Sequence, residues 1–95
     1  MMDPTSFENA KRSIKSKSFE DSQFAIAKQI TQNNCLSAVQ IKGIADLFSF
    51  EATKLDYAKF AWGYCIDRNN YYLINDAFSF ESTIEELDAY ISSQR

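Results

Sequence analysis

The stretch SFEATKLDYAKFAWGYCIDRNNYYLINDAFSFE, residues 49–81, begins and ends with the same tripeptide, Ser-Phe-Glu. The chain carries this tripeptide four times, at residues 6–8, 18–20, 49–51 and 79–81. The last three copies start at residues 18, 49 and 79, which places them 31 and 30 residues apart. A nearly constant period of this length is typical of a repeated supersecondary unit. The stretch therefore predicts a fold built from helix pairs of about 30 residues.

The residues around the copies have helical spacing. A large apolar residue is followed three positions later by Ala-Lys in three places, and two residues three apart share one face of a helix. The three instances are Phe7 with Ala10-Lys11, Phe24 with Ala27-Lys28, and Leu55 with Ala58-Lys59. After the fourth copy, Ile84 and Leu87 keep the spacing, but Asp88 replaces the lysine.

These signals predict six helices in a single domain that spans residues 1–95. Asp3-Pro4 is a cap followed by a proline at the first helical position, and Ser37 with Gln40 forms a capping box. The helices are expected at about residues 4–15, 20–32, from 37, 51–66, 70–77 and 81–92. Residues 51–66 are apolar nearly all round, which marks the central helix. No segment alternates with period two, so the predicted fold class is all-α, a compact bundle of five to six short helices.

Two packing predictions follow from the same pattern. Phe19 with Phe24 and Phe50 with Leu55 have the spacing of a hydrophobic staple, so Phe50 is expected to be buried, as is Trp62. Gly43 lies inside a predicted helix, where glycine is unfavourable, and is expected to allow a neighbouring helix to approach closely.

Composition excludes several classes of function. The formal net charge is -3 and no long basic cluster exists, which argues against nucleic-acid binding. No run of 18 apolar residues is present, so no membrane insertion is expected. Residues 1–4 lack the charged and apolar regions of a signal peptide. The absence of histidine removes histidine-based catalysis and metal ligation. Cys35 and Cys65 are expected to be free thiols, because matching places in packed helical units lie beyond disulfide reach.

One segment resembles the start of a calcium loop. Asp67, Asn69 and Tyr71 have its spacing, but Tyr72 replaces the required glycine and Phe78 the bidentate glutamate. A capped turn is therefore predicted for residues 67–70. Paired carboxylates occur only at helix starts or on a polar face, so no catalytic, metal-binding or cofactor-binding residue is predicted.

In its Ser-Phe-Glu copies and the residues around them, the chain resembles the domain-of-unknown-function family numbered 4476, found chiefly in Bacteroidetes. The resemblance extends from Phe7 to Ile91. It rests on Phe7-x-x-Ala10-Lys11, Ser18-Phe19-Glu20, Ala27-Lys28-Gln29, Gln40-Ile41-x-x-Ile44, Phe48-Ser49-Phe50-Glu51, Lys54-Leu55-x-x-Ala58-Lys59, Asp67-x-x-Asn70-Tyr71 and Asn75-Asp76-Ala77-Phe78. It implies a domain often placed at the C-terminus of exported or cell-envelope proteins, and it brings no known activity.

The candidate site lies where the fourth and fifth helices are expected to meet. Arg68, Asn69, Tyr71 and Tyr72 are residue types that anchor interfaces, and one of two adjacent helical tyrosines must point away from the core. The predicted function is a non-catalytic module that binds a protein or peptide. The alternatives are a structural cap or spacer in an envelope protein and, less favoured, a small carboxylate-based hydrolase.

Overall fold

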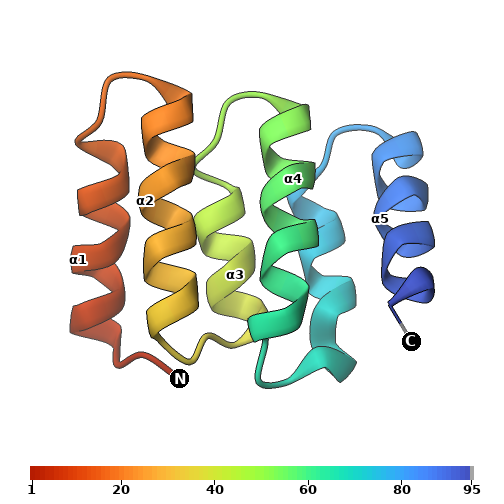
Figure 1. Cartoon of the computed structure of the whole chain (residues 1–95), viewed down its shortest axis with the longest axis horizontal. Helices are drawn as coiled ribbons and strands as arrows, with labels where there is room; N and C mark the ends of the chain where they lie inside the picture. Colours follow the sequence, from red (N-terminus) through yellow and green to blue (C-terminus); the bar gives the residue numbers. More distant parts are fainter. Residues whose placement is uncertain (95) are drawn as a thin grey trace.

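A computed structural model describes residues 1–94 and shows an all-α domain, as predicted (Figure 1). Within that range the helical elements are α1 (Pro4–Lys15), α2 (Glu20–Asn33), α3 (Ala38–Ala45), α4 (Glu51–Ala61), α5 (Glu81–Ser93) and the 3-10 segments η1 (Trp62–Tyr64) and η2 (Arg68–Ala77). No helix in residues 1–94 combines the length and the apolar character that a bilayer crossing requires.

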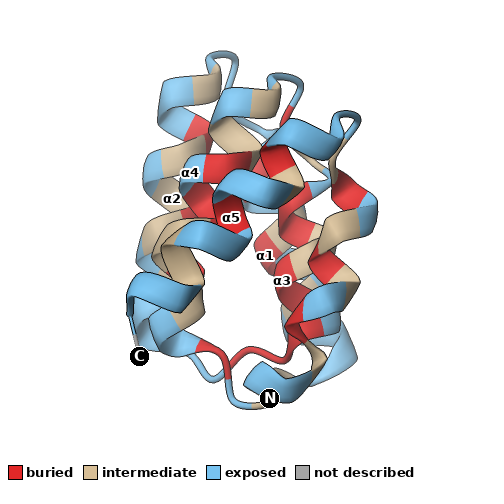
Figure 2. Ribbon diagram, turned by 90° about the vertical axis from the view of Figure 1, so that its right-hand side faces the viewer, coloured by how far each residue is buried: buried red, intermediate tan, exposed pale blue. Residues whose placement is uncertain are grey.

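The helices form two layers. Seen from the α5 end, α2 and α4 lie on one side and α1 and α3 on the other, with buried residues between them (Figure 2). We call α2, α4 and α5 layer one; each begins at the glutamate of a Ser-Phe-Glu copy, and α4 contacts both α2 and α5. We call α1, α3 and η2 layer two, in which α3 contacts η2. Helix α4 touches helices in both layers, as expected of the central helix.

The predicted helix caps are present. The Asp3 carboxylate accepts a hydrogen bond from the Ser6 N–H at 2.9 Å and so caps α1. At the start of α3 the Ser37 hydroxyl accepts from the Gln40 N–H, and the Gln40 side chain accepts from the Ser37 N–H. These bonds satisfy N–H groups that have no partner within their own helix.

The core lies between the layers and is aromatic at its centre. Phe48 is 3% exposed and packs against Phe24 and Tyr57, with ring centroids 6.1 and 5.7 Å away. The buried Tyr57 hydroxyl lies 2.8 Å from the hydroxyl of Thr31, which donates to the Ala27 carbonyl. Because that bond uses the Thr31 proton, the Tyr57 hydroxyl must donate to Thr31. Within residues 1–94, no buried side-chain nitrogen or oxygen lacks a hydrogen-bond partner.

The fourth helix ends earlier than predicted. The α-helix stops at Ala61 rather than near Ile66 and tightens into η1. The chain then turns so that the Ile66 N–H donates to the Leu36 carbonyl at 3.1 Å, an isolated parallel bridge between two connections. A helix continuing to Ile66 would keep that N–H inside its own turn. Pairing with the neighbouring connection replaces the last helical turn.

The fifth helix is a 3-10 helix over Arg68–Ala77 rather than an α-helix over 70–77. Its buried residues are Tyr71, Ile74 and Ala77, three apart, which is the spacing of a helix with 3.0 residues per turn. Phe78 is the C-cap of this helix, is partly buried and packs against the core.

At Gly43 a neighbouring helix comes close, as predicted, but the contact is made by a side chain of that helix rather than by its backbone. A Cβ at this position would lie 3.2 Å from the ring of Phe7, which belongs to α1. Glycine therefore allows the first helix to lay an aromatic ring directly on α3.

Candidate functional site

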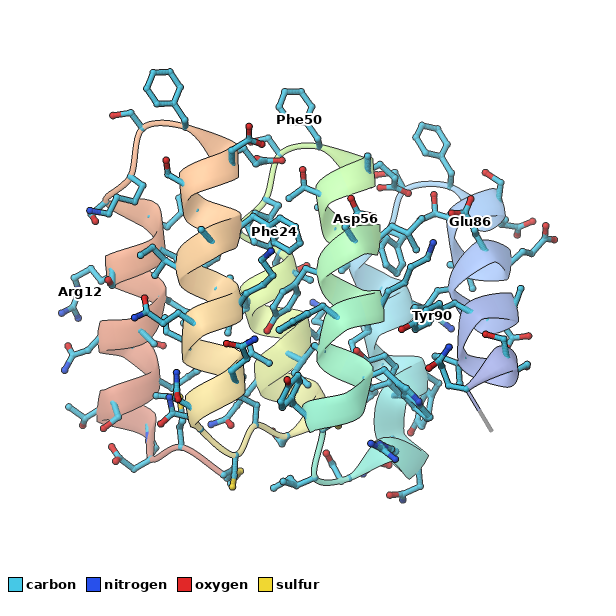
Figure 3. The ribbon with its side chains drawn as sticks, in the orientation of Figure 1. Arg12, Phe24, Phe50, Asp56, Glu86 and Tyr90 are labelled. Carbon is cyan, nitrogen blue, oxygen red and sulfur yellow. The ribbon has the colours of Figure 1, made fainter. Side chains whose placement is uncertain are left out.

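Three phenylalanines with strongly exposed side chains begin the helices of layer one. Phe19, Phe50 and Phe80 precede α2, α4 and α5 and are 75%, 65% and 61% exposed. The starts of these helices follow one another along one edge of the molecule (Figure 1), and the Phe50 ring points away from that edge (Figure 3). We call these three residues the phenylalanine edge.

The prediction that Phe50 is buried is wrong, and so is the staple that motivated it. A staple needs an apolar residue one position before the N-cap. In all three copies the phenylalanine is the N-cap itself, with extended backbone, and glutamate is the first helical residue. Trp62, also predicted to be buried, is half-buried; its ring meets Tyr71 edge-on at 5.0 Å.

The copy at residues 6–8 differs, because it lies inside α1 rather than at a helix junction. Its Phe7 ring is partly buried and packs on the core. The tripeptide therefore has two environments, and only the copies at helix junctions expose their phenylalanine.

The glutamates of the tripeptide hold the phenylalanine edge together. The Glu20 carboxylate accepts hydrogen bonds from the N–H groups of Ser49 and Phe50, at 2.7 and 2.9 Å. Glu51 repeats this contact with the N–H groups of Ser79 and Phe80, at 3.0 and 3.1 Å. Each glutamate thus fixes the backbone of the next exposed phenylalanine, about 30 residues further along the chain. We call these contacts the glutamate ladder.

The ladder sets the charge of its two glutamates. Partial burial raises the pKa of Glu20, but the N–H groups of Ser49 and Phe50 and the Thr53 hydroxyl outweigh it and hold the pKa below its usual value. Burial likewise raises the pKa of Glu51, and donors from Ser79, Thr83 and Phe80 lower it further than burial raises it. Hydrogen bonds to the charged form favour that form. Both carboxylates are therefore ionised near neutral pH.

Sequence reasoning missed both the edge and the ladder, although signals for them were present. The predicted helix starts at Glu20 and Glu51 already put phenylalanine at the N-cap, where it cannot act as a staple. In addition, each junction copy is followed two residues after its glutamate by a hydroxyl side chain, Ser22, Thr53 or Thr83. The full motif is thus Ser-Phe-Glu-x-Ser/Thr, with donors and an acceptor side by side.

Three residues of the sequence-predicted patch, Arg68, Tyr71 and Tyr72, line one groove, whereas Asn69 lies outside it. Tyr71 is buried and its hydroxyl donates to the Ala58 carbonyl, whereas Tyr72 is exposed. Arg68 donates to the carbonyls of Trp62 and Gly63, which closes the end of η1. Asn69 is exposed. The expectation that one of the two tyrosines points outward is confirmed, with Tyr72 as the outward one.

In place of the capped turn predicted at residues 67–70, residues 68–70 form the first turn of η2, where the Asn70 N–H donates to the Asp67 carbonyl at 2.9 Å and the Asp67 side chain does not cap the helix. The Asp67 carboxylate accepts from the Asn70 side chain at 3.0 Å and from the Ala38 N–H at 2.7 Å. These two donors hold the pKa of Asp67 below its usual value. Asp67 thereby caps α3 from the neighbouring connection.

A groove runs between η2 and α5. It has a volume of about 380 Å³ and combines Trp62, Tyr72 and Ile84 with the carboxylates of Glu85 and Asp88. Arg68 and Tyr71 also line it, whereas Asn69 does not. We call it the η2–α5 groove.

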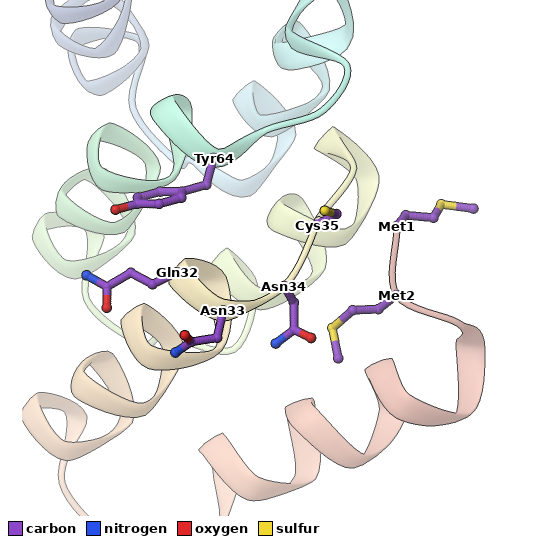
Figure 4. Close-up of a pocket in the computed structure, with 7 residues that line it drawn as sticks. All are labelled: Met1, Met2, Gln32, Asn33, Asn34, Cys35 and Tyr64. Atoms are coloured by element: carbon purple, nitrogen blue, oxygen red, sulfur yellow. The ribbon is translucent and has the colours of Figure 1, made fainter.

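A second hollow lies near the N-terminus and has a volume of about 800 Å³ (Figure 4). It is lined by Met1, Met2, Gln32, Asn33, Asn34, Cys35 and Tyr64. Cys35 is exposed there, while Cys65 is buried elsewhere, and both are free thiols, as expected. No cluster of metal-ligating side chains occurs in the part of the chain that the structure describes.

Taken together, fold and surface define a small two-layered all-α domain whose helix starts are held by a glutamate ladder. Residues 1–91 match the family described as Domain of unknown function (DUF4476), and the chain belongs to that family. Comparison with curated proteins and with solved structures found no match.

Proposed function

We propose that this domain is a non-catalytic module that binds another protein through the phenylalanine edge. The observation that carries the proposal is the exposure of Phe19, Phe50 and Phe80 at matching positions. Clustered exposed apolar side chains mark interaction surfaces, and aromatic residues supply most interface energy.

The backbone beneath the edge is preorganised. Phe50 and Phe80 are fixed through their own N–H groups, so their rings project from a rigid line of helix starts. Packed neighbouring helices lie about 8–10 Å apart, which sets the spacing of the rings. A partner with apolar pockets at that spacing would make three contacts while losing its translational and rotational freedom only once.

The proposal includes the helix-pair repeat. Identical contacts at the junctions of residues 49–51 and 79–81 support a unit of one layer-one helix, one layer-two helix and a Ser-Phe-Glu turn. Repeated units present side chains at regular intervals on one surface, which suits an extended protein partner.

A protein partner is favoured over an anionic membrane. Each ring of the edge is followed directly by a glutamate, and the chain carries a net charge of -3. These negative charges oppose anionic lipid headgroups. Glu20 and Glu51 also need no catalytic role to explain their presence, because their carboxylates accept hydrogen bonds from backbone N–H groups.

The test is affinity capture from an extract of the organism that carries the gene. The bait is the domain, and the variant replaces Phe19, Phe50 and Phe80 together by serine. We expect a protein retained by the wild type to be lost from the variant, because removing an aromatic anchor costs about 1–2 kcal/mol, or roughly tenfold in affinity, per ring.

The matched control replaces three other exposed apolar residues, Val39, Ile66 and Tyr72, by serine. It removes comparable exposed surface outside the edge and should retain the partner. Equal retention by wild type and the phenylalanine variant, both folded by circular dichroism, would refute the proposal. Loss in both variants would show that exposed apolar surface in general causes the capture.

A further inference from the structure

We propose that the α5 end of this domain binds the α1 end of a second copy, so that copies associate head to tail. This interface uses the end helices and the backbone N–H groups of the Ser18-Phe19 turn, whereas the proposed partner surface consists of the phenylalanine rings. The two proposals therefore stand or fall separately.

The glutamate ladder has an open acceptor at one end. Glu81 occupies the position of Glu20 and Glu51 in the last copy of the motif, is exposed, and accepts no hydrogen bond from residues 1–94. Inside the molecule the same carboxylate always accepts from a Ser-Phe turn of the next layer-one helix. Glu81 thus presents the contact surface that two internal junctions use.

The matching donors are open at the other end. Within the described residues, the N–H groups of Ser18 and Phe19 find no acceptor, although the equivalent groups at 49–50 and 79–80 do. Ser22, two residues after Glu20, has the place of the hydroxyl donors Thr53 and Thr83. The molecule therefore carries the acceptor and the donors of one more contact of the glutamate ladder, a rung, at opposite ends: Glu81 at one and the Ser18-Phe19 turn at the other.

The order of elements fits the gap. Between two rungs the chain always contributes a layer-two helix, α3 or η2, before the Ser-Phe turn. Next to α5 such a helix would occupy the η2–α5 groove, which offers Trp62, Tyr72 and Ile84 as apolar contacts. Helix α1, followed directly by Ser18-Phe19, has this order.

Charge complementarity selects a second copy as the occupant. The groove carries Glu85 and Asp88, with Glu81 at the start of the same helix, against one cation, Arg68, which donates to the carbonyls of Trp62 and Gly63. The exposed surface of α1 carries Arg12 and Lys15, while its exposed Glu8 is paired with Lys11 at 2.9 Å, and Arg12 points outward at the end opposite α5 (Figure 3). Opposite charges at the two ends favour head-to-tail contact and disfavour pairing of like ends.

A head-to-tail contact is heterologous, so each bound copy leaves a further end free. We therefore expect the wild-type chain to form dimers and then longer species as its concentration rises, by sedimentation velocity. Added salt should weaken this association, since the end charges are exposed.

Two neutralised variants test the pairing. The first carries Glu85→Gln and Asp88→Asn, and the second carries Arg12→Gln and Lys15→Gln. Each alone should associate at least tenfold more weakly than wild type, while an equimolar mixture should form a dimer that does not grow, because only one complementary pair of ends remains. Circular dichroism confirms that each variant is folded.

Other outcomes overturn the inference. A wild-type chain that stays monomeric up to its solubility limit would do so, as would neutralised variants that associate like wild type. A mixture of the two variants that remains monomeric, while wild type associates, would place the contact elsewhere on the surface.

Discussion

At the scale of single residues, the phenylalanines of this chain have either a packing role or a surface role. Phe48 lies within the core, between Phe24 and Tyr57, while Phe50, two residues later, projects into solvent. The two residues differ in their position relative to the start of α4: Phe50 is its N-cap, and Phe48 lies two residues before the cap. Residue type therefore says little about burial here, and the register of the N-cap decides it.

The first prediction compares these two neighbours. Phe48→Ala should lower the free energy of unfolding by about 3–5 kcal/mol, because it removes buried surface and leaves a cavity. Phe50→Ala should change it by less than about 0.5 kcal/mol, as expected of exposed positions. Urea denaturation of both variants measures the difference. A large loss in Phe50→Ala would show that its ring is buried in solution.

The second prediction concerns the thiols. Burial raises the pKa of Cys65 to about 11, so little thiolate is available at neutral pH, while Cys35 is exposed. Because the thiolate is the reactive form, a maleimide should label Cys35 rapidly in the native protein and Cys65 only after denaturation. Mass spectrometry of labelled peptides gives the rates. Equal labelling of both residues under native conditions would contradict the buried position of Cys65.

How far the sequence predicts the residue scale depends on the range of the interactions. The Asp3 cap, the Ser37–Gln40 box and the close approach at Gly43 were predicted correctly, since each depends on neighbours a few positions away or on a single missing side chain. The partner of Glu20 lies 29 and 30 residues further along the chain. The repeated motif supplies the donors and the acceptor, but no local pattern specifies which distant N–H groups each carboxylate reaches, and so the ladder was not predicted.

At the scale of elements, helix boundaries were predicted best where local signals act alone. The first helix matches the prediction at both ends, because its cap, proline and apolar face agree. The fourth and fifth helices differ from prediction, because contacts between their connections override local propensity. At the same junction Tyr71 is buried and Tyr72 is exposed, as expected of adjacent helical tyrosines, and both line the η2–α5 groove.

The third prediction tests the ladder as a link between helices. Glu20→Gln and Glu51→Gln should each lower the free energy of unfolding at pH 7 by about 1 kcal/mol, the usual value of a cap. The folded-state pKa values lie below the ordinary 4.5. The stabilisation is therefore present above pH 4.5 and disappears as the pH falls through the folded-state values.

Denaturation curves between pH 7 and pH 3 measure this effect. The difference between each variant and wild type should shrink on acidification. Glu81→Gln is the matched control, studied at low concentration, because Glu81 has the same place in the motif without a bonded partner. An equal loss in the control would mean that the charge at the helix start, rather than the link, stabilises the fold.

At the scale of the whole molecule, stability should fall from the centre to the ends. Within the described residues, α3 buries five residues and α4 buries four, whereas α1 and α5 bury two each. Elements that bury few residues open locally at a small free-energy cost. The two end helices are therefore the ones most easily separated from the rest.

The fourth prediction follows from this gradient. In native-state hydrogen exchange, amides in the middle of α3 and α4 should exchange most slowly, and those of α1 and α5 faster. Nuclear magnetic resonance resolves the rates by residue. Uniform protection over all helices would show that the domain opens only as one unit. Protection of α5 that rises with protein concentration would further support contact between copies.

The length of η2 has a mechanical consequence. Ten residues of 3-10 helix at about 2.0 Å each span about 20 Å, whereas the same residues would span about 15 Å as an α-helix. One end of η2 is tethered through Asp67 to Ala38, and the other, through Ser79 and Phe80, to Glu51. The segment is therefore anchored at both ends, near its first and its last residue. We therefore expect loss of the Glu51 contact to free one end of η2 and to favour the shorter α-helical form, against the three-residue spacing of its buried side chains.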